Sequence, residues 1–134
     1  MASIRREISI AAPAEKVWDA VRDVGAIRTR LARGFVTDVK LEDGARVVTF
    51  ANGMTARELI VDSNDADRRL AWSVVGSGRM THHNASAQVF PEGNGHSRFV
   101  WIADLLPHDA APAVAAMIEQ GLLAVKRTLE SASG

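Results

Sequence analysis

The sequence lacks cysteine, net charge and any long hydrophobic run. Without cysteine the chain cannot form disulfides, thiolate nucleophiles or cysteine-ligated zinc sites. Its sixteen basic and sixteen acidic side chains cancel, so no overall field favours nucleic acid or an anionic membrane. No apolar run approaches the roughly 18 residues that a membrane span requires. These absences predict a protein that neither binds nucleic acid nor inserts into a membrane.

The composition predicts one globular domain over residues 1–134. Hydrophobic residues make up 47% of the chain and charged residues 24%, which is an ordinary balance for a folded domain with its own core. The first seven residues lack the apolar segment of a signal peptide. We therefore expect a cytoplasmic protein, either a monomer or a homodimer.

The longest stretch with helical periodicity is the last one, over residues 109–130. Val114, Gly121 and Val125 belong to an apolar stripe with steps of three and four residues. Pro112 stands where a first-turn proline fits a helix. This long amphipathic helix requires an apolar surface to cover it, and a concave sheet would supply one.

Most of the chain before that helix is predicted to form strands joined by short turns. Apolar alternation predicts a first strand at residues 4–10, and Pro13 ends it and can begin a short helix. Residues 27–31 are predicted to form a second short helical segment. Further strands are predicted at residues 35–41, 45–50, 54–61, 70–75, 80–90 and 97–104. This order favours an α+β fold with seven antiparallel strands.

Several motifs resemble the START-like, or SRPBCC, superfamily along nearly the whole chain. They are residues 12–18 (APAEKVW), 57–59 (REL), 68–72 (RRLAW), 97–101 (SRFVW) and 105–107 (LLP). The sequence is most similar to bacterial members labelled polyketide cyclase/dehydrase, and more distantly to plant abscisic-acid receptors and birch pollen allergen. The resemblance implies a helix-grip fold, in which a curved sheet wraps the C-terminal helix around an apolar cavity.

The resemblance also implies which face of each strand lines the cavity. Glu58 and Trp72 match ligand-contacting positions of the receptor-like members, whereas His83 replaces their pocket tyrosine. The receptors' gate loop is reduced here to residues 51–53 and lacks their Ser-Gly-Leu-Pro pattern. Because side chains alternate along a strand, these positions also fix their neighbours. The predicted ligand contacts are Met54, Ala56, Glu58, Trp72, Val74, His83, Ala85, Phe99, Trp101, Ala113, Met117 and Gly121.

Glu58 and His83 are the two ionisable groups on this otherwise apolar face. Together they could serve as acid and base in an aldol-type cyclisation and dehydration, so they are the candidate catalytic residues. In the alternative interpretation, Glu58 forms an ion pair with an arginine and His83 is a wall residue. The two residues are two strands apart, about 9–10 Å, so we expect no direct hydrogen bond between them.

The sequence predicts neither a metal site nor a cofactor. His82 and His83 are adjacent on a predicted strand and point to opposite faces, so they cannot chelate one metal ion. No glycine-rich phosphate loop and no nucleophile elbow is present in the sequence.

Three functions remain open at this stage. The first is binding of a small, largely apolar molecule, aromatic or lipid-like, in the internal cavity. The second is polyketide cyclase/dehydrase-type catalysis by Glu58 and His83. The third is a protein-interaction role with a vestigial cavity filled by Trp72, Trp101 and Met117. A continuous space between helix and sheet would favour the first two.

Overall fold

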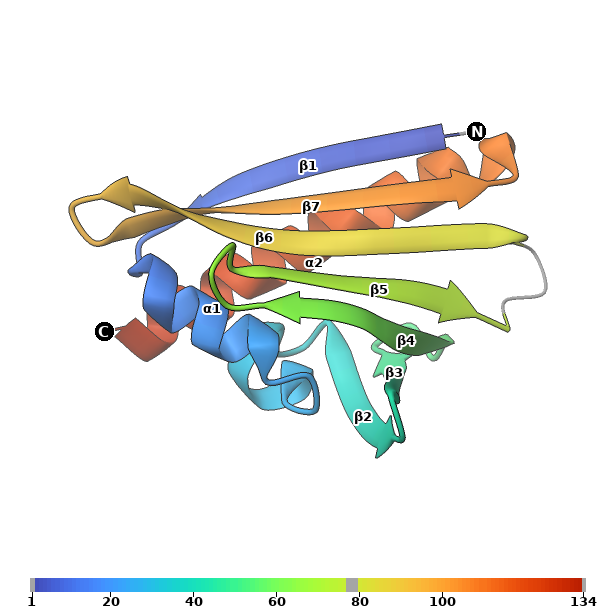
Figure 1. Cartoon of the computed structure of the whole chain (residues 1–134), viewed down its shortest axis with the longest axis horizontal. Coiled ribbons are helices and arrows are strands. Elements are labelled where there is room, and N and C mark those ends of the chain that lie inside the picture. The colour runs from blue at the N-terminus through green and yellow to red at the C-terminus, as the bar shows by residue number, and fades with distance from the viewer. Residues whose placement is uncertain (1, 77–79, 134) are drawn as a thin grey trace.

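A curved seven-stranded antiparallel sheet and a long C-terminal helix dominate the computed structural model, which describes residues 2–76 and 80–133. The strand order across the sheet is β1-β7-β6-β5-β4-β3-β2, so all strands except the first follow one another as neighbours (Figure 1). The strands are β1 (Ala2–Ile10), β2 (Val36–Glu42), β3 (Ala45–Phe50), β4 (Thr55–Asn64), β5 (Arg69–Val75), β6 (His82–Gly93) and β7 (His96–Leu106). The helix-grip fold expected from the sequence is confirmed.

The helices are α1 (Ala14–Arg22), the short π-helical segment η1 (Ile27–Leu31), the 3-10 turn η2 (His108–Ala110) and α2 (Ala111–Ser133). Figure 1 shows α2 running behind the sheet along its length, with α1 and η1 at the end of the sheet near the C-terminus. Helix α2 packs against β1 and η1, and α1 packs against β5, β6 and β7. The two short helical segments predicted after the first strand are therefore present.

The core lies between the concave face of the sheet and α2. Ile10, Leu70 and Phe99 from the sheet, and Ile118 and Val125 from α2, are each at least 98% buried. This agrees with the predicted apolar stripe of the last helix, because positions three and four residues apart face the same side.

Alternation along β6 matches the prediction on its inward side. His83, Ala85, Ala87 and Val89 are buried, whereas His82 and Asn84 are exposed. Ser86, predicted to face outward, is nevertheless 6% exposed. It is the cross-strand partner of Ala71 on β5 and Ile102 on β7, in the middle of the sheet where neighbouring strands flank it on both sides.

The predicted ends of most elements differ from the observed ones by one to three residues, and three elements illustrate this. Strand β4 continues through Asn64, although residues 62–67 have the polar composition of a loop. Strand β6 starts at His82 rather than residue 80, and of the glycine-rich connection before it only Gly76 falls within the described residues. Helix α2 begins at Ala111 and continues past the predicted end to Ser133.

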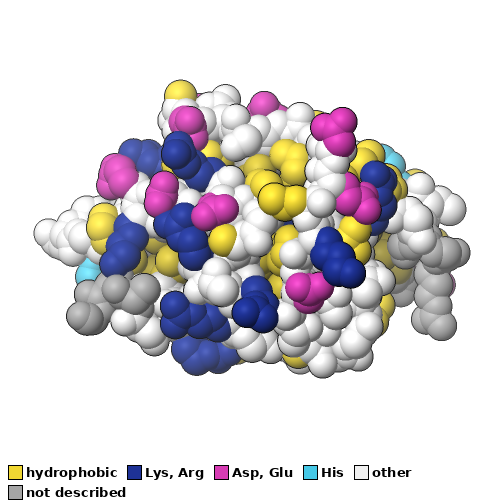
Figure 2. Space-filling model, turned by 90° about the horizontal axis from the view of Figure 1, so that it is seen from below, with side chains coloured by type: hydrophobic (Ala, Val, Ile, Leu, Met, Phe, Trp, Pro, Cys, Tyr) yellow, Lys and Arg dark blue, Asp and Glu magenta, His cyan; other side chains and the backbone are white. Residues whose placement is uncertain are grey.

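Charges of both signs are interspersed on the molecular surface. Figure 2, the view from below Figure 1, shows Lys and Arg side chains lying beside Asp and Glu, around hydrophobic side chains that reach the surface. Arg30, for example, contacts Asp19 at 2.6 Å and Asp23 at 2.9 Å. The local pairing of arginines with carboxylates agrees with the zero net charge of the sequence.

Candidate functional site

A large cavity of about 1380 Å³ lies between the concave face of the sheet and α2. It reaches from Val21 and Ile27 at the α1–η1 end to Asn52 in the β3–β4 turn and Pro107 just after β7. Ligand pockets for small molecules commonly measure about 300–1,000 Å³, so this volume is ample for one. The structure thus contains a cavity in the position that the resemblance implies.

Every predicted ligand-contact residue except Ala85 lines this cavity. Ala85 is buried and pairs with the much larger Trp72 on β5. Met54 is 63% exposed and Ala113 is also exposed, so these two residues belong to the rim rather than to the interior. Glu58 and Trp72 lie in the buried wall, each 7% exposed.

The main polar feature of the cavity wall is an ion pair between Arg46 and Glu58. Arg46 on β3 and Glu58 on β4 are cross-strand partners, and Arg46 Nε donates to Glu58 Oε1 at 2.8 Å. Their side chains are 4% and 9% exposed. Burial raises the pKa of Glu58 above its ordinary value, while the charge and hydrogen bond of Arg46 act in the opposite direction. The arginine ion pair weighed from the sequence is therefore the observed arrangement.

Two further contacts hold the Arg46 guanidinium. Nη1 donates to the backbone carbonyl of Val24 at 3.3 Å, and the guanidinium carbon lies 5.4 Å from the ring centre of Trp72. A cation over an indole face is favourable, particularly where water is excluded. Arg46 is thus fixed by a carboxylate, a carbonyl and an aromatic ring at once.

Arg46 was not among the residues predicted from the sequence. Strand β3 carries apolar residues on both faces, including Val47 and Val48, so alternation there does not define an inward side. The available signal was the hairpin register: residues 45–50 and the next strand pair across a short turn, which places a basic residue opposite Glu58. Because Glu58 was already placed inward, its cross-strand arginine could have been placed there too.

His83 lies in the same row of the sheet as this ion pair. Glu58 on β4 is paired with Val74 on β5. Between β5 and β6, Ser73 is paired with Asn84, so the next position along the two strands places Val74 opposite His83. The two candidate catalytic residues are therefore separated by one intervening strand, or about 9–10 Å between backbones. Both residues lie in the same wall of the cavity, but Glu58 is hydrogen-bonded to Arg46 and not to His83.

His83 is buried, and its Nδ1 atom has no hydrogen-bond partner in the structure. Burial lowers the pKa of His83, and the nearby His82 lowers it further. At neutral pH the imidazole is therefore uncharged, with one nitrogen donating and the other accepting. Nδ1 is covered by protein atoms, so a ligand in the cavity would approach the ring from the side of Nε2, for which no hydrogen bond is present among the described residues.

Aromatic side chains shape the cavity wall beside the ion pair. Trp72 and Trp101 contact each other edge to face, with ring centres 6.1 Å apart. Gly121 of α2 allows Trp101 to approach closely, because a Cβ atom at this position would lie 2.8 Å from the Trp101 ring and 3.1 Å from Phe35. At Gly121, then, the small residue permits close packing of helix and sheet at the cavity wall.

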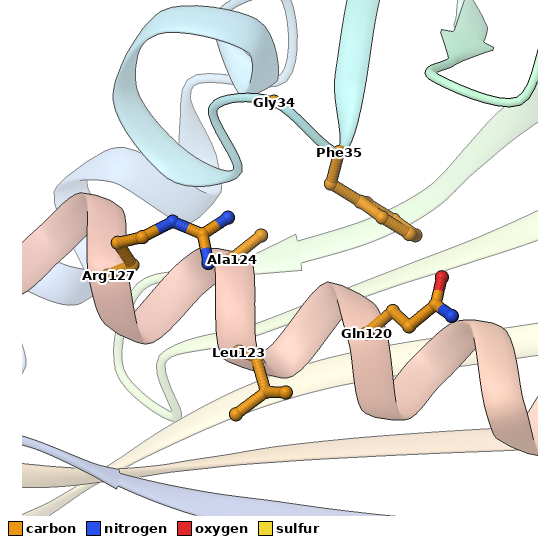
Figure 3. A pocket seen from close by; sticks show the side chains of 6 residues that line it. All are labelled: Gly34, Phe35, Gln120, Leu123, Ala124 and Arg127. Carbon is orange, nitrogen blue, oxygen red and sulfur yellow. The ribbon is translucent and has the colours of Figure 1, made fainter.

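A second, shallower pocket of about 250 Å³ lies on the outer side of α2. Figure 3 shows Phe35 pointing toward α2 near Gln120, with Arg127 farther along the helix toward its C-terminal end. Phe35 and Gln120 also line the large cavity, so the two spaces meet at this ring. The second pocket is therefore a small surface extension of the main cavity.

The sequence matches the family described as "Polyketide cyclase / dehydrase and lipid transport" over residues 1–130. The chain belongs to this family. No protein with a curated description has a matching sequence. The resemblance to START-like proteins is thus confirmed, and the family supports small-molecule binding or cyclase/dehydrase-type activity in general terms.

Solved structures share the fold at low sequence identity. An uncharacterised protein from Bacillus thuringiensis is 20% identical, with a TM-score of 0.86 over 96% of this chain and 98% of its own. A START superfamily protein from Mycobacterium smegmatis is 13% identical, with a TM-score of 0.70 over 97% and 95%. Norcoclaurine synthase from Thalictrum flavum, solved with dopamine and hydroxybenzaldehyde, is 16% identical, with a TM-score of 0.72 over 98% and 86%. At such identities these neighbours establish the family's fold and leave its chemistry open.

The described residues contain neither a membrane-spanning helix nor a metal-binding cluster. No helix among them is both long and apolar enough to cross a bilayer. Within residues 2–76 and 80–133, no three His, Asp or Glu side chains form a group that could hold a metal ion.

Proposed function

We propose that this protein binds a small, largely apolar molecule in the cavity between the sheet and α2. The supporting observation is a space of about 1380 Å³ that remains with Trp72, Trp101 and Met117 in its wall. Ligand sites typically combine apolar and aromatic walls with a few fixed polar groups, and here those groups are Arg46, Glu58 and His83. The aromatic side chains line this cavity without filling it, which argues against the alternative of a vestigial cavity.

Binding of Nile red, a neutral apolar dye, tests this proposal. We expect saturable binding with a defined stoichiometry, and we expect Gly121→Leu to weaken it at least about 10-fold, because the added side chain drives Trp101 and Phe35 into the cavity. Fluorescence titration of the folded variant measures this change.

The matched control is Glu119→Leu, which places the same side chain on the exposed side of α2. This variant should bind the dye as the original protein does. A folded Gly121→Leu protein with unchanged affinity would place the site elsewhere.

Catalysis is the second candidate function, favoured by one observation: two ionisable groups, Glu58 and His83, line the same apolar cavity. The ion pair with Arg46 argues for a positioning role, because it engages Glu58 Oε1. We therefore propose a carrier or sensor rather than an enzyme.

Glu58→Gln and His83→Asn separate the two functions. In a carrier both variants should keep affinity within a few-fold, since each retains shape and some hydrogen bonding. In an enzyme each should keep affinity but lose turnover by roughly 100-fold or more, the usual contribution of a positioned acid or base. Incubation with aromatic polyketide-like ketones, followed by product analysis, makes the measurement. A product that depends on either side chain would contradict the carrier function.

A further inference from the structure

The charges in the cavity wall are already paired. In the described part of the wall the guanidiniums are those of Arg46 and Arg57, and each contacts a carboxylate, Glu58 at 2.8 Å and Glu42 at 2.9 Å. Asp109 adds a further carboxylate near the rim. The described wall contains no lysine. A negatively charged ligand would therefore meet no cation that lacks a partner in this part of the chain.

Arg46 is also poorly placed to exchange its partner for a ligand anion. Its guanidinium is held by Glu58, by the Val24 carbonyl and by the face of Trp72. A ligand carboxylate that reached Arg46 would lie beside the carboxylate of Glu58. Two like charges in a site shielded from water repel each other strongly, and burial alone already disfavours a second charge there.

His83 offers the opposite kind of contact. The residue is 8% exposed and lines the cavity; Nδ1 is covered by protein atoms, which leaves Nε2 as the ring nitrogen that can meet a ligand. Its partner on β7 is Leu105, and continuing the β5–β6 register beyond Ser73–Asn84 places Val74 on its other side, so neither neighbour in this row is a competing polar side chain. In a neutral imidazole, the nitrogen without a hydrogen accepts a hydrogen bond from a hydroxyl, and the nitrogen that carries the hydrogen donates one to a carbonyl.

From these contacts we infer that the cavity selects neutral ligands with a hydroxyl or carbonyl group, which binds His83, and rejects the same molecules when they carry a carboxylate. This inference rests on the proposed function, since it specifies the ligand class of that same cavity. The selectivity arises from complementary polar groups. A ligand group that hydrogen-bonds to a buried donor or acceptor gains affinity, whereas a ligand charge that finds no partner beside an already paired buried charge loses it.

Three ligands with one aromatic body test the inference: 2-naphthol, 2-naphthoate and 2-methylnaphthalene. Each competes with Nile red at about pH 7, where the naphthol is neutral and the naphthoate is charged. We expect 2-naphthol to bind about 10-fold more tightly than 2-methylnaphthalene, as one buried hydrogen bond allows. The charged naphthoate should bind at least about 10-fold more weakly than 2-methylnaphthalene, because desolvation of its charge is uncompensated.

The variants His83→Leu and His82→Leu assign the effect. His82 is adjacent in sequence but exposed on the other face of β6, so it is the matched control. His83→Leu should remove the advantage of 2-naphthol over 2-methylnaphthalene, whereas His82→Leu should keep it.

The outcomes separate this inference from the proposed function. Naphthoate binding as tight as that of naphthol, or a naphthol advantage that persists in His83→Leu, would overturn the inference while Nile red binding left the proposed function standing. Failure of the original protein to bind Nile red would overturn both.

Discussion

Arg46→Met is expected to lower the free energy of unfolding by about 3–5 kcal/mol, the cost of leaving one member of a buried ion pair without its partner. The side chains of Arg46 and Glu58 are 4% and 9% exposed, so water cannot readily replace the lost partner. The variant also loses the contact between the guanidinium and the Trp72 ring. Chemical denaturation followed by tryptophan fluorescence measures the change.

A double variant distinguishes loss of pairing from loss of packing. Arg46→Met combined with Glu58→Leu removes both charges and keeps similar volumes, so most of the lost stability should return. If the double variant is as unstable as Arg46→Met alone, the defect lies in packing around the methionine rather than in an uncompensated carboxylate.

The penalty in Arg46→Met should also depend on pH. Burial raises the pKa of Glu58 above its ordinary value of 4.5, and without Arg46 nothing on the opposite strand counteracts that rise. The folded state then holds the carboxyl proton more tightly than the unfolded chain does, so stability falls as pH rises through the raised pKa. Denaturation at about pH 4 and pH 8 should show the smaller penalty at the lower pH. An equal penalty at both would contradict the assignment to Glu58.

The fold follows from sequence patterns because its elements are long and their periodicity is unambiguous. The apolar stripe of α2 and the inward alternation along β6 are examples. The end of β4 was missed for a physical reason. Ser63 and Asn64 pair with Leu70 and Arg69 in the β4–β5 hairpin, and β-ladder bonds are made by the backbone whatever the side chain is. A polar strand end therefore resembles a loop in composition.

Much of the candidate cavity could also be predicted, because strand alternation extends one inward residue to its neighbours. What alternation does not supply is the state of the polar groups. The pairing of Glu58 requires the register between β3 and β4, and the unpaired Nδ1 of His83 requires knowledge of every neighbouring side chain. Both depend on the tertiary structure, and they determine whether the polar groups of the cavity wall pair with each other or remain free to bind a ligand.

Trp18→Ala is expected to cost about 3–5 kcal/mol of stability, as large-to-small core substitutions do. Trp18 lies on α1, is 5% exposed, and is not part of the lining of the large cavity. Its indole Nε1 donates to Asp65 Oδ1 at 2.9 Å, which ties α1 to the β4–β5 turn. Thermal and chemical denaturation give the loss.

Trp18→Phe isolates the packing part of that effect. The phenyl ring keeps most of the buried apolar surface and loses only the hydrogen bond to the exposed Asp65, so it should cost about 1 kcal/mol. Under conditions where both variants remain folded, Nile red should bind each with unchanged affinity, because α1 supports the sheet from outside the cavity at this residue. Stability that survives Trp18→Ala, or dye affinity that falls with it, would move Trp18 from the structural core into the ligand site.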